Sequence, residues 1–140
     1  MTSTKMFPFM VILLFFLAAC GTSQKVKWST EHLAVKSAYV QKYVPGQEGE
    51  KVISYLFIDI EFIDSSIVLE RALYNEHTAP ISKVRLPLKI NWAAGETDQS
   101  EKLEVNQAII YYAKGTKKYK QLVEGIQTKE DLHLPITESE

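Results

Sequence analysis

Residues 52–62 read VISYLFIDIEF, and this stretch decides the fold class because its apolar side chains alternate. In an extended chain, one side would carry Leu56, Ile58, Ile60 and Phe62. The opposite side would carry Tyr55, Phe57, Asp59 and Glu61. Because successive side chains of a strand point to opposite faces, the alternation predicts a β-strand with its first set facing a core.

The same alternation recurs along the chain. Val84–Trp92 is the cleanest case, with one side formed by Val84, Leu86, Leu88, Ile90 and Trp92. Pro87 lies inside this run and has no backbone donor, so it predicts an edge strand or a bulge. Leu103–Ala113 would place on one face Leu103, Val105, Ile109 and Tyr111. Shorter candidate strands are Val35–Val44, Ile67–Tyr74, Tyr119–Ile126 and Asp131–Leu134. A helix is a competing interpretation only for Ile67–Tyr74.

Turn-forming residues separate these runs at 45–50, 78–80 and 94–98, and Lys114-Gly115-Thr116 predicts a tight hairpin. About seven strands without a long amphipathic helix predict an all-β fold. We expect an antiparallel β-sandwich of immunoglobulin-like type, with a small β-barrel as the alternative.

Composition narrows the classes of protein that the chain can represent. Its 140 residues suit one domain, and 6 glycines with 5 prolines exclude a collagen-like or low-complexity chain. A net charge of -1 provides no basic face for the phosphates of a nucleic acid. The single cysteine cannot form a disulfide within the chain.

The N-terminal segment is uniformly apolar. Residues 6–19 read MFPFMVILLFFLAA and follow one charge, Lys5. As a helix they would rise about 21 Å, which is short of the ~30 Å hydrocarbon core of a bilayer. A basic start, a short apolar run and small residues at its end predict a signal peptide.

The end of that run, Leu17-Ala18-Ala19-Cys20, resembles the lipobox of bacterial lipoproteins. The resemblance covers roughly the first 21 residues. It implies cleavage between Ala19 and Cys20 and attachment of a diacylglyceryl group to the Cys20 sulfur. The expected organisation is a signal peptide at 1–19, a tether at 20–29, a β-sandwich domain at 30–134 and a flexible acidic tail at 135–140. A plain signal peptide cut after Ala19 is the competing interpretation.

The residues after Cys20 bear on the location. Gly21 differs from the aspartate that commonly holds such lipoproteins in the inner membrane, and residues 22–25 lack the acidic cluster associated with surface export. The resemblance therefore implies a lipid anchor in the bacterial cell envelope, in the outer membrane and facing the periplasm. The membrane would be one partner, and an envelope protein or cell-wall component the other.

Motifs that carry chemistry do not occur at the spacing that catalysis or metal binding needs. His32, His77 and His133 stand far apart, and no nucleophile elbow or phosphate-binding glycine motif is present. Asp59 and Glu61 would lie roughly 6–7 Å apart on one strand, most simply on a solvated face. We therefore expect no catalytic residue, no metal site and no cofactor.

Two surfaces are candidates for contact. The first surrounds the predicted hairpin and contains Lys114, Lys117, Lys118 and Tyr119, with Lys120 nearby. It could touch anionic lipid headgroups or an acidic glycan, or its lysines could keep the hairpin soluble and its edges unpaired. The second is the strand face with Tyr55 and Phe57, which we expect a second layer or loop to cover.

These observations predict a non-catalytic, membrane-anchored envelope lipoprotein that serves as an interaction or accessory module. The alternative is a lipocalin-like carrier of a small apolar ligand. Eight strands of about ten residues each, plus loops, would nearly fill the chain after Cys20, which disfavours that alternative.

Overall fold

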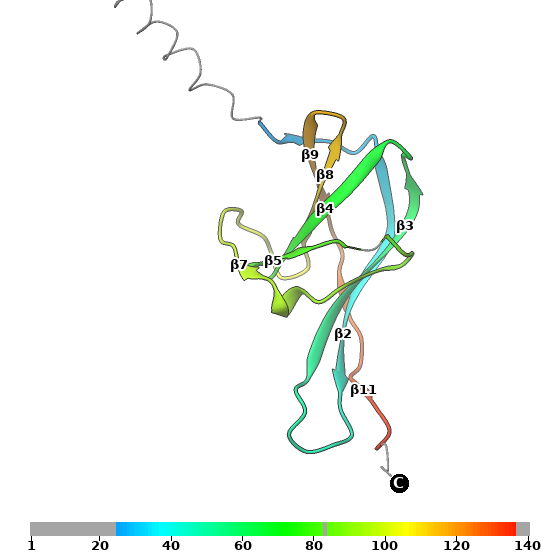
Figure 1. Cartoon of the computed structure of the whole chain (residues 1–140), viewed down its shortest axis with the longest axis vertical. Coiled ribbons are helices and arrows are strands. Elements are labelled where there is room, and N and C mark those ends of the chain that lie inside the picture. The colour runs from blue at the N-terminus through cyan, green and yellow to red at the C-terminus, as the bar shows by residue number, and fades with distance from the viewer. Residues whose placement is uncertain (1–24, 83, 137–140) are drawn as a thin grey trace, which may run out of the picture.

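The computed structural model describes residues 25–82 and 84–136, and the strands dominate them (Figure 1). The strands are β1 (Lys27–Trp28), β2 (Leu33–Val44), β3 (Ile53–Ile63), β4 (Ile67–Tyr74), β5 (His77–Pro80), β6 (Leu88–Ile90), β7 (Glu96–Thr97), β8 (Ala108–Lys114), β9 (Lys117–Val123), β10 (Gln127–Thr128) and β11 (Leu132–His133). One 3-10 turn, η1 (Trp92–Ala94), is the only helical element of these residues. The all-β prediction is confirmed. The lipobox with Cys20, and residues 137–140 of the predicted tail, lie outside the described residues.

The strands form two sheets. Sheet A has the order β1-β9-β8-β4-β5-β7, and sheet B has the order β10-β2-β3-β6 with β11 also on β2. The long strands pair antiparallel, but β1 on β9, and β10 and β11 on β2, are parallel. The expectation of purely antiparallel sheets is therefore wrong at their edges. Two-residue strands need only a few backbone hydrogen bonds, so they leave no alternation in the sequence that could be recognised.

Neither sheet closes on itself in the described part of the chain, so the small-barrel alternative is also wrong. The two sheets instead contribute to one apolar core, which makes the fold sandwich-like. Sheet B supplies Leu56, Ile58 and Ile60, as predicted, and sheet A supplies Ile110 and Tyr112. Burial of such side chains contributes roughly 1.5–3 kcal/mol each.

The predicted inward face of β3 fails at one residue, Phe62, which is 54% exposed. The register of β2 and β3 shifts between Ala34 and Val35, so one extra residue is inserted on β3. A bulge of this kind reverses the side-chain alternation. As a result Ile63 packs against the core and Phe62 turns outward.

Two strands are shorter than the alternating sequence runs that predict them. From Val84–Trp92 only β6 forms, at the edge of sheet B, because Pro87 directly before it has no N–H to extend the ladder. From Leu103–Ala113 only the second half enters β8. A turn precedes it, in which the Gln107 N–H donates to the Glu104 carbonyl at 3.1 Å, and Val105 is 92% exposed.

The remaining strand predictions are closer to the structure. Ile67–Tyr74 is strand β4, paired with β8, and not a helix. The hairpin at Gly115-Thr116 joins β8 and β9 as predicted, with Gly115 at φ 60°. Lys27–Trp28, in the segment expected to be a tether, pairs with β9.

The β2–β3 hairpin projects beyond the rest of the sandwich (Figure 1). We define this projection, residues 41–55 with β11 beside them, as the arm. At its tip the loop packs closely on the C-terminal segment. A Cβ atom on Gly46 would lie 2.7 Å from the Leu134 carbonyl oxygen, so only glycine fits there.

Candidate functional site

The predicted lysine surface belongs to the β8–β9 turn, which lies at the opposite end of the molecule from the arm (Figure 1). Two of its three lysines are occupied by carboxylates from distant parts of the chain. The Lys114 ammonium donates to Asp64 Oδ2 at 3.0 Å, and the Lys118 ammonium pairs with Glu70. Lys117, at the turn, is exposed and forms no ion pair with another described residue.

Tyr119 faces inward, on the opposite side of β9 from Lys118. Its ring stacks on Tyr112 with centroids 5.6 Å apart and contacts the His32 ring at 4.9 Å. Tyr119 is thus half-buried against the core. The predicted set therefore consists of two ion-paired lysines, one exposed lysine and one half-buried ring.

His32, Tyr112 and Ser29 close this end of the sandwich. His32 Nδ1 lies 3.1 Å from the Tyr112 hydroxyl and 3.3 Å from Ser29 Oγ. Burial raises the pKa of the Tyr112 hydroxyl, and the hydrogen bond from Ser29 partly opposes that effect. The three groups satisfy one another, and they fix the chain as it enters β2.

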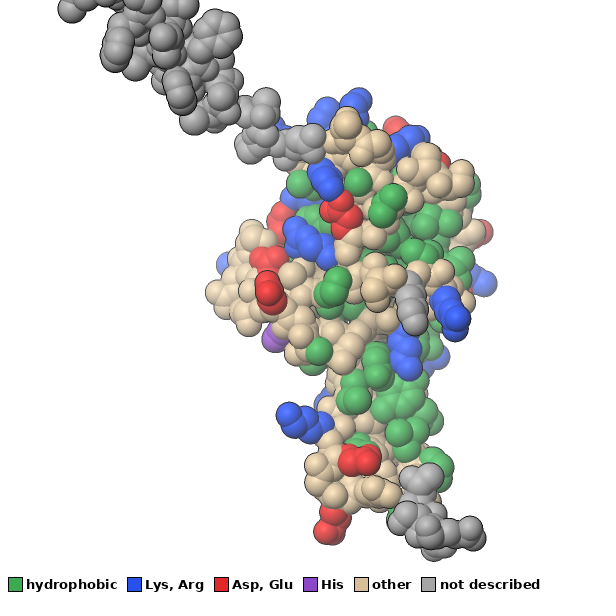
Figure 2. Space-filling view, in the orientation of Figure 1, with side chains coloured by type: hydrophobic (Ala, Val, Ile, Leu, Met, Phe, Trp, Pro, Cys, Tyr) green, Lys and Arg blue, Asp and Glu red, His purple; other side chains and the backbone are tan. Residues whose placement is uncertain are grey.

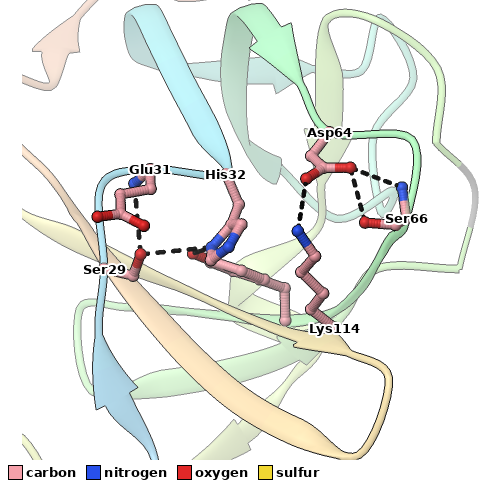
Figure 3. Close-up of polar contacts among 7 residues, drawn as sticks. Ser29, Glu31, His32, Asp64, Ser66 and Lys114 are labelled. Atoms are coloured by element: carbon pink, nitrogen blue, oxygen red, sulfur yellow. Dashed lines mark hydrogen bonds and ion pairs between the residues drawn. The ribbon is translucent and has the colours of Figure 1, made fainter.

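Asp64 caps the turn between β3 and β4 (Figure 3). The Ser66 hydroxyl and the Ser66 N–H donate to Asp64 Oδ1 at 2.7 and 2.9 Å. With Lys114 on the other oxygen, these donors hold the pKa of Asp64 well below its usual range. Its role is therefore to fix the turn as an ionised acceptor.

The outer face of sheet A is covered by the segment 98–107. Leu73, Ile109 and Tyr111 form a second buried cluster there, and Leu103 of the segment packs on it. Arg71 lies over the Tyr111 ring at 3.7 Å.

Acidic residues of the covering segment hold it to the basic groups of this face. Arg71 Nη1 reaches Asp98 Oδ2 at 3.4 Å, and the Lys120 ammonium pairs with Glu101. Lys120 also lies 4.3 Å from the centre of the Trp28 ring.

The outer face of sheet B is different, because its rings pack on one another. We call Tyr39, Tyr43, Tyr55 and Phe57 the aromatic face. The Tyr39 and Phe57 rings stack with centroids 4.8 Å apart, and Tyr43 meets Tyr55 edge-on at 5.2 Å. Lysines border the rings, with the Lys89 ammonium 4.3 Å from the Tyr55 centroid and that of Lys129 3.7 Å from Tyr39.

The expected cover over Tyr55 and Phe57 is therefore not a second layer. Phe57 is buried among tyrosines of its own face, and Tyr39, Tyr43 and Tyr55 stay partly accessible. The pairing register places Ile53 and Leu132 beside Tyr43, so the face continues along the arm, where Figure 2 shows apolar side chains. Sequence reasoning selected Tyr55 and Phe57 but missed Tyr39 and Tyr43, although their spacing on the predicted strand was a usable signal.

A cleft of about 590 Å³ borders the aromatic face at the edge of sheet B. Tyr55 and Lys89 line one side of it, and apolar residues line much of the remainder: Ala79, Pro80, Ile81, Leu88 and Ile90. The cleft and the aromatic face thus share Tyr55, and Lys89 borders both.

The remaining predicted chemistry is dispersed. Among residues 25–82 and 84–136, no three His, Cys, Asp or Glu side chains gather as metal ligands. His77 Nδ1 lies 2.8 Å from the Asn75 carbonyl oxygen, and His133 lies in β11. Asp59 is half-buried and Glu61 is exposed at the bulge of β3.

Comparisons with known proteins give no further assignment. No helix in the described part of the chain combines the length and apolar character needed to cross a bilayer. No protein-family model, curated protein or solved structure matches the chain.

Proposed function

We propose that the chain is a membrane-anchored, non-catalytic envelope lipoprotein that binds a partner through the aromatic face of sheet B. The observation that carries this proposal is the difference between the two outer faces. The face of sheet A is covered by 98–107, whereas the rings of sheet B pack on one another and, among the described residues, are bordered by Lys89 and Lys129. Aromatic residues are enriched in protein interfaces because they bury a large area with few rotatable bonds.

The anchor rests on the lipobox-like Leu17-Ala18-Ala19-Cys20, which precedes a folded domain beginning at Lys27. Two acyl chains on Cys20 hold a protein stably on a bilayer, whereas a single chain binds only marginally. We assign the protein to the envelope, in the outer membrane facing the periplasm.

Metabolic labelling with palmitate tests the anchor. The full chain is expected to incorporate the label, and Cys20→Ser is expected to abolish it. Ser23→Cys in the Cys20→Ser background is the matched control, since it restores a thiol outside the motif and is expected to stay unlabelled. Equal labelling of Cys20→Ser and the unmodified chain would refute the lipoprotein assignment.

We also propose that the sandwich is immunoglobulin-like. Of the seven strands with three or more residues, the first, second and fifth (β2, β3, β6) form sheet B. The third, fourth, sixth and seventh (β4, β5, β8, β9) form sheet A in the order β9-β8-β4-β5. Immunoglobulin-type sandwiches divide their first, second and fifth strands from their third, sixth and seventh in this way.

The absence of catalysis is supported by the use already made of the polar groups. Asp64 fixes the β3–β4 turn, Asp98 holds the covering segment to Arg71, and His32 bonds to Tyr112 at the end of the sandwich. We assign them structural roles and expect no cofactor.

Photo-crosslinking of the lipid-anchored chain in cells tests the contact surface. Benzoylphenylalanine at Tyr43 or Tyr55 is expected to give a discrete crosslinked species with an envelope protein or cell-wall material. The same residue at Val105, which is exposed on the covering segment of sheet A, is expected to give none. Equal crosslinking at Val105 and Tyr55, or none at Tyr43 and Tyr55, would contradict the assignment.

One observation supports the carrier alternative, namely the apolar lining of the 590 Å³ cleft. A native mass spectrum of the intact chain with a bound lipid, lost in Ile81→Asp, would favour a carrier. A spectrum of the unliganded mass would favour the interaction module.

A further inference from the structure

The strongest unassigned feature is a group of lysines that the chain path gathers at the anchored end. Lys25 and Lys27, at the start of the described chain, line a common hollow with Thr116, Lys117 and Lys118 of the β8–β9 turn. The two segments meet because β1 pairs parallel to β9, with Lys27 opposite Tyr119. Basic side chains gather at this end of the molecule (Figure 2).

The charges of this group are not neutralised equally. The Lys118 ammonium pairs with Glu70, and Lys114 nearby pairs with Asp64. Lys25, Lys27 and Lys117 are exposed, and none of them pairs with a carboxylate of another described residue. We define these three as the basic end.

The basic end is also the part of the domain closest to the proposed anchor. Four residues lie between Cys20 and Lys25, and the five residue steps from one to the other span at most about 18 Å even when fully extended. Electrostatic attraction in physiological salt decays over about 8 Å, so any shorter path brings the lysines into the range of the headgroups. The anchor itself raises the effective concentration of the surface, so weak contacts suffice.

We infer that Lys25, Lys27 and Lys117 bind anionic phospholipid headgroups and orient the anchored domain with the β8–β9 turn toward the bilayer. The arm and the aromatic face along it then point away from the membrane, where a partner can reach them. This inference rests on the proposed lipid anchor at Cys20. Each lysine near an anionic surface shifts the contact equilibrium roughly fivefold, so three shift it roughly 100-fold.

The test uses the full lipid-modified chain, reconstituted in vesicles of phosphatidylcholine alone or mixed with phosphatidylglycerol. Because the chain has one cysteine and the lipid occupies it, Thr116→Cys introduces a single free thiol for a fluorophore at the turn. Glu48→Cys does the same at the tip of the arm. Quenching by a lipid-borne quencher reports which end approaches the headgroups.

The fluorophore on Thr116→Cys is expected to be quenched in the phosphatidylglycerol vesicles, and high salt is expected to relieve this quenching. The fluorophore on Glu48→Cys is expected to stay unquenched. Lys25→Gln/Lys27→Gln/Lys117→Gln is expected to remove the quenching. The matched control Lys42→Gln/Lys51→Gln/Lys102→Gln, which has the same change in net charge away from the turn, is expected to retain it.

Three outcomes overturn the inference. The first is equal quenching in neutral and anionic vesicles. The second is an equal loss of quenching in both triple variants. The third is quenching of the fluorophore at Glu48→Cys in place of the one at Thr116→Cys. Mass spectrometry of the same sample separates the two proposals. An acylated chain that floats with vesicles but shows no quenching at Thr116 refutes only the orientation, whereas an unacylated chain refutes the anchor and the orientation with it.

Discussion

The outer faces of the two sheets begin from similar sequence but end in different environments. Sheet A carries Tyr111 on its outer face and sheet B carries Tyr39, Tyr43 and Tyr55, and in both a cation lies over a ring: Arg71 over Tyr111, and Lys89 over Tyr55. In sheet A the ring joins Leu73 and Ile109 in a second buried cluster. In sheet B the rings mainly pack on one another.

The difference arises from one segment, which directly precedes β8 in the sequence. Residues 98–107 cross sheet A, where Asp98 meets Arg71 and Glu101 meets Lys120. Local alternation can therefore specify a strand and its two faces, but the cover of the outer face depends on which loop reaches it. An aromatic strand face is core in one sheet and accessible surface in the other.

Truncation of the covered face is expected to have the largest effect on stability. Leu73→Ala should lower the free energy of unfolding by about 2–4 kcal/mol, because it removes a fully buried side chain and leaves a cavity. Ile53→Ala, on the accessible face, should lower it by less than about 1 kcal/mol. Urea denaturation midpoints measure both, and similar losses would break the contrast between the faces.

Removal of the cations should give a smaller difference in the same direction. Arg71 covers Tyr111, donates to Thr78 Oγ1 at 2.9 Å and reaches Asp98. Arg71→Ala should therefore cost about 1–2 kcal/mol in thermal or urea unfolding. Lys89→Ala has only ring contacts to lose and should cost about 0.5 kcal/mol. A larger loss for Lys89→Ala would show that the aromatic face is the more tightly packed of the two.

Trp28 tests how far the outer face of sheet A extends toward the tether. Trp28 is 55% exposed, and its ring lies under Lys120. Because roughly half of its surface is buried, Trp28→Ala should reduce the unfolding free energy by about 1 kcal/mol. An unchanged urea midpoint would mean that β1 does not contribute to stability and that the stable part of sheet A begins at β9.

Acid should loosen the cover of sheet A before it affects sheet B. The Ser100 hydroxyl and N–H, followed by Arg71, lower the pKa of Asp98. A lowered folded-state pKa contributes stability above the usual pKa near 4, and this stability is lost as pH falls through the folded-state pKa. As pH falls from 5 to 3, the hydrogen-exchange protection factors, which are corrected for the intrinsic slowing of exchange in acid, should therefore decrease in residues 98–107 first.

In Asp98→Asn, residues 98–107 should be less protected from exchange than in the unmodified chain already at pH 5. Their protection should also depend less on pH. The effect is the smallest of this series, because partly exposed pairs contribute about 0.5 kcal/mol. Asp64→Asn is the matched control, since it removes another carboxylate of lowered pKa at the β3–β4 turn. If Asp64→Asn, and not Asp98→Asn, reduced the protection of residues 98–107, the assignment would be contradicted.

Much of the fold could be predicted from alternation, and the failures occur where pairing with another strand decides the structure. Leu56, Ile58 and Ile60 face the core as expected, because β3 is regular there. Phe62 turns outward at a bulge, and nothing in the sequence of β3 alone specifies where β2 shifts its register. The two-residue strands β1, β10 and β11 are set by pairing with segments that are distant in the sequence.

The candidate surfaces show the same limit. The sequence locates the lysines of the β8–β9 turn correctly, but Asp64 and Glu70, which occupy two of them, come from about fifty residues earlier in the chain. Tyr119 was grouped with the lysines by proximity in sequence, and strand alternation turns it to the core. Pairing between distant segments decided which charged groups remain available.

The close fit of Gly46 against Leu134–Ile136 reflects the arm's dependence on residues made much later. The edge of β2 from Tyr39 to Val44 is completed by β10 and β11, and the Gln41 side chain donates to the Glu130 carbonyl 89 residues away. During synthesis the β2–β3 hairpin therefore emerges with an open strand edge beside exposed tyrosines, which is a template for aggregation. β10 and β11 cover this open edge of β2 in the folded chain. A chain that stops before Gln127 is therefore expected to aggregate through the β2–β3 hairpin.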